Sequence, residues 1–266
     1  MTVPVLLVTK GHPFEREAFL AMFDHLVETG LITYEHVEHP DVEARLHPDR
    51  LAPAEVVVFY DMPGLHFTRA EPPLAVVEPS DEYVAGFEAL LAAGTGMLFL
   101  HHAMASWPSW ARYAEVVGAR FLYQPGDLWG RPWPDSGYLL DVEHTVEVVA
   151  PDHPVCAGLP PSFALRDELY LTPPVLPDVT PLLRTTHPMT DDRFFSADEA
   201  IRGRRHSRDG WSHPAGPDLI GWTHVVERSR VVYLQPGDGP SSYADPHVRR
   251  LLANSIAFVA SGAVSR

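Results

Sequence analysis

The chain has 266 residues, of which 45% are hydrophobic and 21% are charged, and 20 Lys and Arg against 35 Asp and Glu give a net charge of −15. These values are typical of a folded globular protein and argue against non-specific binding to nucleic acid or to an anionic membrane. The N-terminal apolar run is short and lacks a basic leader, and no stretch of about 18 apolar residues occurs, so we expect a cytoplasmic protein without a signal peptide or transmembrane helix.

The first 120 residues alternate between strand-like and helix-like segments. Apolar runs predict strands at Val3–Val8, Ile32–Val37, Val56–Tyr60 and Met97–Leu100. Apolar spacing and capping residues predict helices from Phe14 to Val27 with Gly30 at the C′ position, from a Ser80 cap to Gly94, and from a Ser109 cap to Gly118. This order predicts an α/β fold with right-handed crossovers and a mostly parallel sheet that helices cover on both faces.

The second half departs from this rhythm. We expect a long ordered loop at 124–137, strands at Tyr138–Val142 and Thr145–Val149, and extended segments over 150–182. Residues 187–218 form the most loop-like part, which is typical of a lid or a binding loop. Leu219–Val226 and Val231–Gln235 are expected to pair as a hairpin in the core, and Asp245-Pro246 to begin a final helix. We expect one domain over residues 1–266.

Four predicted strands end in polar or turn-forming clusters. These are Gly11-His12, Asp61-Met62-Pro63-Gly64, His101-His102 and Pro236-Gly237-Asp238-Gly239. In open parallel sheets the ligand crevice lies outside the carboxyl ends of the strands, so we expect the four clusters to meet at one edge. Histidine titrates near neutral pH, which makes the three histidines candidates for proton transfer. Because successive strand side chains alternate, we expect one of His101 and His102 to face the crevice and the other to pack beneath it.

Each candidate also has a purely structural interpretation. His12 could cap the first helix, Asp61 and Asp238 could be turn residues, and the Asp167-Glu168 pair could be exposed acidic residues in an extended segment. Trp107 belongs to a group of tryptophans that could stack on sugar faces or anchor the core. The arginines within 202–208 could hold a carboxylate or phosphate, or form a solvated loop.

A nucleophilic triad is not expected. The turn after the Met97–Leu100 strand carries no thiol or hydroxyl at the bend, and the lone cysteine, Cys156, is expected to be a small buried hydrophobe. A single cysteine also excludes an internal disulfide or a CxxC motif. No GxGxxG, Walker A or HExxH pattern occurs, so we expect no cofactor, although His12, His101 and His102 could hold a divalent metal such as zinc.

These segments together resemble the ThuA-like family, which is named for a trehalose-utilisation protein and is similar in fold to class I glutamine amidotransferases. The matching pieces are Gly11-His12-Pro13-Phe14, Val57–Asp61, Gly96–Ala103, His153-Pro154 with Gly158-Leu159, Asp167-Glu168-Leu169-Tyr170, and Val231-Val232-Tyr233 with Pro236-Gly237. The resemblance spans roughly residues 3–260. It implies a flavodoxin-like sheet without the amidotransferase cysteine, and a role in carbohydrate metabolism on oxidised (3-keto) sugars or glycosides. Family members usually carry Gly-His where this chain has Gly237-Asp238, and the 187–218 segment is longer than the resemblance leads one to expect.

Our main hypothesis is therefore an enzyme that acts on a small keto-sugar or glycoside by acid–base chemistry. The catalytic candidates are His101 or His102 as base or acid, His12 as carbonyl-side donor, and Glu168 as an orienting or hydroxyl-binding group. The substrate-binding candidates are Gly11, Phe14, Asp61, Trp107 and Asp238. One alternative is a non-catalytic sugar-binding or regulatory protein; another is a metal-dependent hydrolase with these histidines and an acidic residue as ligands. A homo-oligomer is compatible with the sequence.

Overall fold

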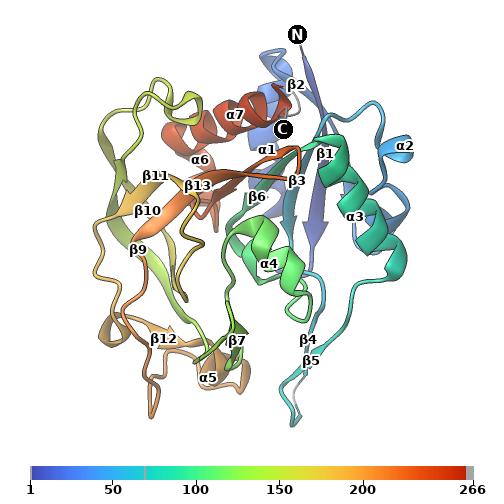
Figure 1. Cartoon of the computed structure of the whole chain (residues 1–266). Coiled ribbons are helices and arrows are strands. Elements are labelled where there is room, and N and C mark those ends of the chain that lie inside the picture. The colour runs from blue at the N-terminus through green and yellow to red at the C-terminus, as the bar shows by residue number, and fades with distance from the viewer. Residues whose placement is uncertain (1, 69, 262–266) are drawn as a thin grey trace.

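A ten-stranded sheet forms the centre of the computed structural model, which describes residues 2–68 and 70–261 (Figure 1). Its strands are β1 (Val3–Lys10), β2 (Ile32–Glu38), β3 (Val56–Asp61), β6 (Gly96–Leu100), β9 (Gly137–Val148), β10 (Ser162–Leu171), β11 (Thr180–Thr185), β12 (Phe195–Ser196), β13 (Leu219–Val226) and β14 (Ser229–Leu234). The order is β10-β9-β11-β13-β14-β6-β3-β1-β2, and β12 also pairs with β9. Two small antiparallel sheets are separate from it: β4 (Leu65–Phe67) with β5 (Leu74–Val76), and β7 (Gly126–Leu128) with β8 (Arg131–Trp133).

The sheet has a parallel half and an antiparallel half. Strands β2, β1, β3, β6 and β14 are parallel neighbours, in the 2-1-3-4-5 order of flavodoxin-like folds. Strands β13, β11, β9 and β10 extend this sheet with antiparallel pairs. Every residue of β3 and β6 is buried, as expected for strands covered on both faces. The predicted α/β fold class is confirmed.

Helices lie on both faces of the parallel half (Figure 1). The helices in the described residues are α1 (Arg16–Glu28), α2 (Pro48–Leu51), α3 (Asp81–Ala93), α4 (Ala111–Val117), α5 (Ala197–Ile201), α6 (Pro240–Ala244) and α7 (Pro246–Ala260). Of these, α5 lies away from the parallel half, beside β12 (Figure 1). On one face, Phe19 of α1 and Ile256 of α7 belong to one buried core. On the other, Phe87 of α3 and Val116 of α4 belong to a second core. The alternating side chains of each central strand supply both cores.

Three predicted helix ends follow from local capping chemistry. The Ser80 hydroxyl accepts the Tyr83 N–H at the start of α3, and Gly94 ends that helix in the left-handed region at φ 85°. The Asp245 carboxylate accepts two N–H groups at the start of α7, with Pro246 in the first turn. The Ser109 cap was wrong, because α4 begins at Ala111 after Trp110 with no side-chain cap.

The second half is more ordered than the sequence indicated. The expected loop at 124–137 contains the β7–β8 hairpin, whose turn residues Trp129 and Gly130 both have positive φ. The two strands expected between 138 and 149 are one strand, β9, which continues through Asp141 in the left-handed region at φ 61°. The proline-rich segment 150–182 contains the ten-residue strand β10. The 187–218 segment is not loop throughout, because it holds β12 and α5.

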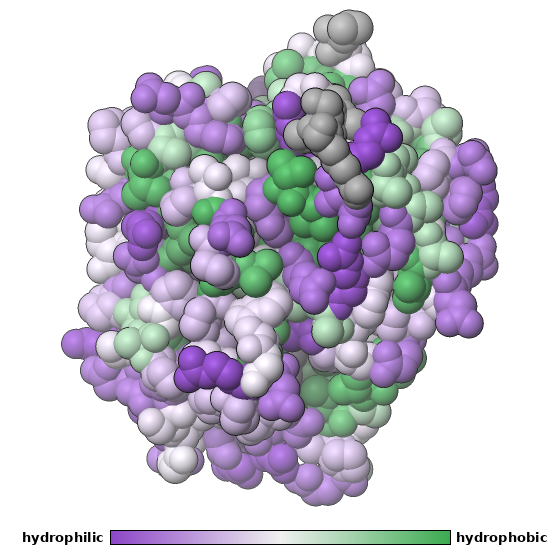
Figure 2. All heavy atoms as spheres, in the orientation of Figure 1, coloured by the Kyte–Doolittle hydropathy of each residue, from purple (hydrophilic) through white to green (hydrophobic). Residues whose placement is uncertain are grey.

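The face of the molecule drawn in Figure 2 is largely hydrophilic. Figure 2 shows hydrophilic side chains over most of one face, with hydrophobic side chains in scattered patches. In the described ranges, no helix combines the length and the apolar character needed to cross a membrane.

Candidate functional site

The polar clusters at the ends of the parallel strands meet at one edge of the sheet. His12 follows β1, Asp238 follows β14, and His101 begins the short 3-10 helix His101–Ala105 directly after β6. The rings of His12 and His102 stack with centroids 4.4 Å apart, and the rings of His101 and His102 lie 5.8 Å apart at 89°. The structure thus brings together three imidazoles from two strand ends, with Asp238 from a third.

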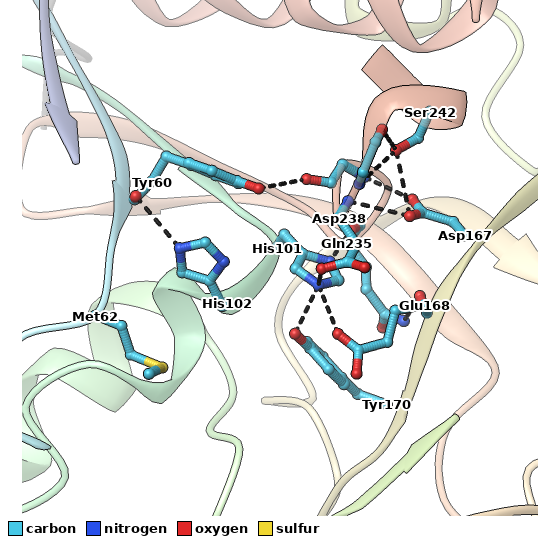
Figure 3. Close-up of polar contacts among 12 residues, drawn as sticks. Tyr60, Met62, His101, His102, Asp167, Glu168, Tyr170, Gln235, Asp238 and Ser242 are labelled. Atoms are coloured by element: carbon cyan, nitrogen blue, oxygen red, sulfur yellow. Dashed lines mark hydrogen bonds and ion pairs between the residues drawn. The ribbon is translucent and has the colours of Figure 1, made fainter. Parts of the chain in front are cut away.

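His101 lies at the centre of a polar cluster (Figure 3). Its Nε2 is 2.9 Å from Glu168 Oε2, 2.6 Å from the Tyr170 hydroxyl and 3.3 Å from Asp238 Oδ1. Its Nδ1 lies 2.7 Å from the Gln235 carbonyl oxygen, which can only accept, so Nδ1 carries a hydrogen in this contact. His101 is fully buried and has a backbone φ of 47°, an uncommon conformation for a residue other than glycine.

The two carboxylates decide the charge of His101. Burial by itself lowers the pKa of His101, but the hydrogen bonds and negative charges of Asp238 and Glu168 outweigh it and hold that pKa well above its usual value. Burial raises the pKa of Asp238, yet the bond to His101 and the His101 charge leave that pKa lowered. The raised pKa of His101 and the lowered pKa of Asp238 both indicate a protonated His101 imidazole, which neutralises part of the surrounding negative charge.

His12 and His102 differ from His101, because their pKa values are lowered. His102 is buried, its Nε2 lies 3.3 Å from the Tyr60 carbonyl oxygen, and burial together with the nearby His12 and His101 lowers its pKa well below the usual value. His12 is half-buried, and burial followed by the charge of His101 lowers its pKa. Both rings are therefore neutral at neutral pH, with His102 behind His12.

Asp167 fixes the loop that carries Asp238. Its carboxylate accepts the Gly237 N–H at 2.6 Å, the Asp238 N–H at 3.0 Å and the Ser242 hydroxyl at 3.2 Å (Figure 3). Burial raises the pKa of Asp167 to about 6. The β9–β10 register shifts between Asp167 and Leu169, an irregularity of the kind that redirects side chains next to functional sites.

A second contact holds the same loop from the other side. The Tyr60 hydroxyl lies 2.9 Å from the Gly237 carbonyl oxygen and 2.7 Å from the Tyr243 hydroxyl. The Tyr243 hydroxyl donates to the Asp238 carbonyl oxygen at 2.7 Å. The backbone around Asp238 is therefore held by buried groups from β3, β10 and α6.

A cavity of about 680 Å³ opens beside this cluster. Its wall contains His12, Glu168 and Tyr170. The remaining lining is largely aromatic or comes from the 187–218 segment: Pro13, Phe67, Phe121, Tyr123, Tyr138, Leu140, Ala197, Ala200, Ile201, Arg205 and His206. This volume accommodates a small organic molecule, and aromatic faces with a few convergent polar groups are typical of ligand sites.

None of the five predicted substrate-binding residues lines the described wall of this cavity. Asp238 contacts His101 instead, at 3.3 Å. Asp61 is fully buried and lies 2.6 Å from Nε2 of His39. Trp107 is buried, and its ring lies 5.0 Å from that of Tyr83, which matches its core interpretation.

Phe14 and Gly11, which were also predicted to bind substrate, follow the end of β1. Phe14 packs edge-on against the rings of Phe19 and Tyr60, each at 5.3 Å. Gly11, at φ 100°, lies so close to Met62 that an added Cβ would be 2.4 Å from the Met62 carbonyl oxygen. Gly11 thus allows β1 to turn into His12 against the end of β3.

Cys156 lies in the core, whereas the arginines within 202–208 form ion pairs or line the cavity. Cys156 is buried, and burial raises the pKa of its thiol to about 11, which agrees with the expected structural role. Arg202 pairs with Glu71 and Asp198, and Arg204 with Glu199, whereas Arg205 lines the cavity.

Sequence reasoning did not assign Tyr170, Gln235 or Tyr60 to the site, and it considered Asp167 only as part of the Asp167-Glu168 pair. Tyr170 had a usable signal, because residues two apart on a strand project from the same face and Glu168 was a candidate. Gln235 contributes through its backbone carbonyl, for which side-chain identity carries no signal.

Comparisons with known proteins agree on the fold. A protein-family model described as ThuA, trehalose utilisation, matches residues 4–259. A ThuA-like protein from Parabacteroides merdae superposes with a TM-score of 0.68 at 15% identity, covering 100% of this chain and 92% of that one. A ThuA-like protein from Bacteroides uniformis gives 0.66 at 18% identity, with 97% and 91% covered. A cytoplasmic protein from Salmonella typhimurium gives 0.56 at 13% identity, with 98% and 99% covered. The search of curated proteins found no match.

Proposed function

The chain belongs to the ThuA family of trehalose utilisation, and from that premise we propose that it is an enzyme of carbohydrate metabolism that acts on a keto-sugar or keto-glycoside by acid–base chemistry. One observation carries the proposal. A single cavity has a neutral imidazole, a carboxylate and a phenol in its wall, from His12, Glu168 and Tyr170. A base and a proton donor that face each other across bound substrate are what enolisation of a ketone needs.

We assign the base to His12. Its ring lines the cavity and its lowered pKa keeps it unprotonated at neutral pH, so it can accept a proton from a carbon next to a ketone. His102 stacks behind it and is buried, so it positions the His12 ring and does not meet the substrate. This assignment differs from the sequence hypothesis, in which His101 or His102 was the base.

The reaction proposed for a 3-keto-glycoside is an elimination. His12 takes the proton from C2, the electron pair forms an enolate with the C3 ketone, and the enolate then expels the glycosidic oxygen from C1. The C1–O bond breaks, a carbon–carbon double bond forms between C1 and C2, and the alcohol leaves with the proton that His12 holds. Tyr170 lines the same cavity, and its hydroxyl, 2.6 Å from His101 Nε2, is the donor proposed for the ketone oxygen.

The aromatic wall supports a sugar-like ligand. Phe121, Tyr123 and Tyr138 line the cavity, and aromatic faces of this kind pack against the apolar C–H faces of sugar rings. Arg205 and His206, at the same wall, offer N–H donors for hydroxyl oxygens.

The test is a screen of 3-keto-glycosides beside the same glycosides with all hydroxyls intact. We expect release of alcohol and growth of enone absorbance from the keto compounds alone. A His12→Gln variant should lower kcat/KM about 100-fold or more, because a general base contributes about that much. The control is His25→Gln, which changes an exposed histidine of α1.

Two results would contradict the proposal. The first is wild-type turnover in His12→Gln protein that folds normally by circular dichroism. The second is binding of the keto compounds, measured by calorimetry, without consumption of any of them. The second result would favour a non-catalytic sugar-binding protein.

A further inference from the structure

His101, Glu168 and Asp238 direct three ligand atoms toward one point, and we refer to them as the His101 cluster. The histidine Nε2 and one carboxylate oxygen from each acidic residue all lie within 4.8 Å of one another. The individual separations from Nε2 are 2.9 Å to Glu168 and 3.3 Å to Asp238. Zinc holds nitrogen and oxygen ligands at about 2.0–2.2 Å, and tetrahedral geometry then places neighbouring ligand atoms roughly 3.3–3.6 Å apart. The separation between His101 Nε2 and Asp238 Oδ1, 3.3 Å, lies at that spacing, whereas the 2.9 Å separation between His101 Nε2 and Glu168 Oε2 has to widen by roughly 0.4 Å when a cation binds.

The imidazole is oriented as a metal ligand would be. Because Nδ1 donates to the Gln235 carbonyl oxygen at 2.7 Å, Nε2 faces the two carboxylates. A hydrogen bond from the other ring nitrogen to a carbonyl is the usual support for a ligating histidine. The His101 backbone carbonyl accepts the Tyr233 hydroxyl at 2.9 Å, so the residue is fixed at both its ring and its main chain.

Negative charge exceeds positive charge in the His101 cluster. Glu168 is buried, the side chain of Asp238 is 29% exposed, and one imidazole faces both. In the described ranges, no Lys or Arg side chain forms an ion pair with either carboxylate. Burying two carboxylates beside a single imidazole costs desolvation free energy, and a cation bound between them would offset that cost.

The cluster reaches the cavity through Glu168, the one proposed ligand that lines it. Tyr170 lines the cavity too, and its hydroxyl lies 2.6 Å from His101 Nε2, so a cation at Nε2 would contact or displace that hydroxyl on the cavity side. Three protein ligands with a free position toward a cavity are typical of catalytic metal sites, whereas structural zinc sites have four. One imidazole and two carboxylates, without a thiolate, suit zinc or manganese.

We propose that the His101 cluster is a binding site for one divalent transition-metal cation, zinc or manganese, which His101 Nε2, Glu168 and Asp238 hold and which has an open position on the cavity. The proposal concerns ligand atoms and does not depend on keto-sugar chemistry. A cation at this point would take the place of the His101 proton between the carboxylates and could polarise an oxygen of a ligand in the cavity.

The test measures metal and needs no substrate. Full-length protein without a histidine tag is dialysed against a chelator, freed of it, and titrated with ZnCl₂ or MnCl₂ by calorimetry. Elemental analysis of protein purified without added metal is done in parallel. We expect saturation at one equivalent for at least one of the two metals. Glu168→Gln and Asp238→Asn should each raise Kd about tenfold or more.

The matched control is Asp135→Asn. Asp135 is also a buried carboxylate, bonded to the Ser196 hydroxyl and the Asp198 N–H, and it is not part of the cluster. Its variant should bind metal with a Kd close to that of the wild type. Absence of saturable binding by the wild type for both metals would overturn the site. The site would also be overturned if a folded Glu168→Gln or Asp238→Asn variant bound metal with the wild-type Kd. Either result leaves the keto-sugar screen to be judged on its own.

Discussion

His144 should make the protein sensitive to mild acid. It lies on β9, 8% exposed, with Nδ1 2.9 Å from the Thr185 hydroxyl. Burial is the main cause that lowers its pKa from 6.5 to about 4. A base whose folded-state pKa is below its unfolded value stabilises the fold fully above pH 6.5, and this contribution is lost as pH falls toward 4. Because one pKa unit corresponds to about 1.36 kcal/mol, the loss is about 2 kcal/mol by pH 5 and about 3 kcal/mol by pH 4.

The assay is urea unfolding of the wild type and of His144→Gln at pH 7, 6, 5 and 4. Glutamine does not titrate, so the free energy of unfolding of the variant should fall less steeply, by about 2 kcal/mol between pH 7 and pH 5. His25→Gln, which replaces an exposed histidine on α1, is the control and should keep the wild-type slope. Equal slopes for the wild type and His144→Gln would refute the argument that buried, neutral His144 carries this sensitivity.

Three further substitutions test other parts of the structure. Gly11→Ala should lower the free energy of unfolding by about 2 kcal/mol or more in urea, because φ is 100° and the new Cβ would meet the Met62 carbonyl oxygen at 2.4 Å; a neutral effect would mean that this turn relaxes freely. Tyr60→Phe should cost about 1–2 kcal/mol in the same assay, because it removes a buried hydroxyl bonded toward Tyr243; no loss would show that the bond is dispensable. Cys156→Ala should leave keto-glycoside turnover unchanged in a steady-state assay, since burial raises the pKa of the thiol to about 11; lost turnover in folded protein would contradict a purely structural role.

Local pattern was sufficient for the parallel half of the fold. Each central strand is a run of apolar residues buried on both faces, so its identity does not depend on register. The helix that starts at Ser80 and the one that starts at Asp245 are encoded by the capping residue itself. The antiparallel half was harder, because β9 continues through a left-handed Asp141 and β7 and β8 turn through a left-handed Trp129. Positive φ is uncommon in residues other than glycine; Asp adopts it more often than most residues and Trp does not, so residue type alone does not predict it at either position.

The candidate site was also predicted in part from local sequence and in part decided by the tertiary structure. The amino-acid order alone determined that His12, His101 and Asp238 follow strands of one sheet, and the strand-end rule then required them to share an edge. It also determined that no thiol stands at the bend after β6.

Only the tertiary structure decided which of these groups touch. It placed Glu168 against His101, 67 residues away, moved Trp107 into the core, and brought Arg205 of the 187–218 segment to the cavity wall. Such contacts depend on the register of β10 against β9 and on the packing of distant loops. Their free energies come from pairs of segments far apart in the chain, so no local pattern contains them.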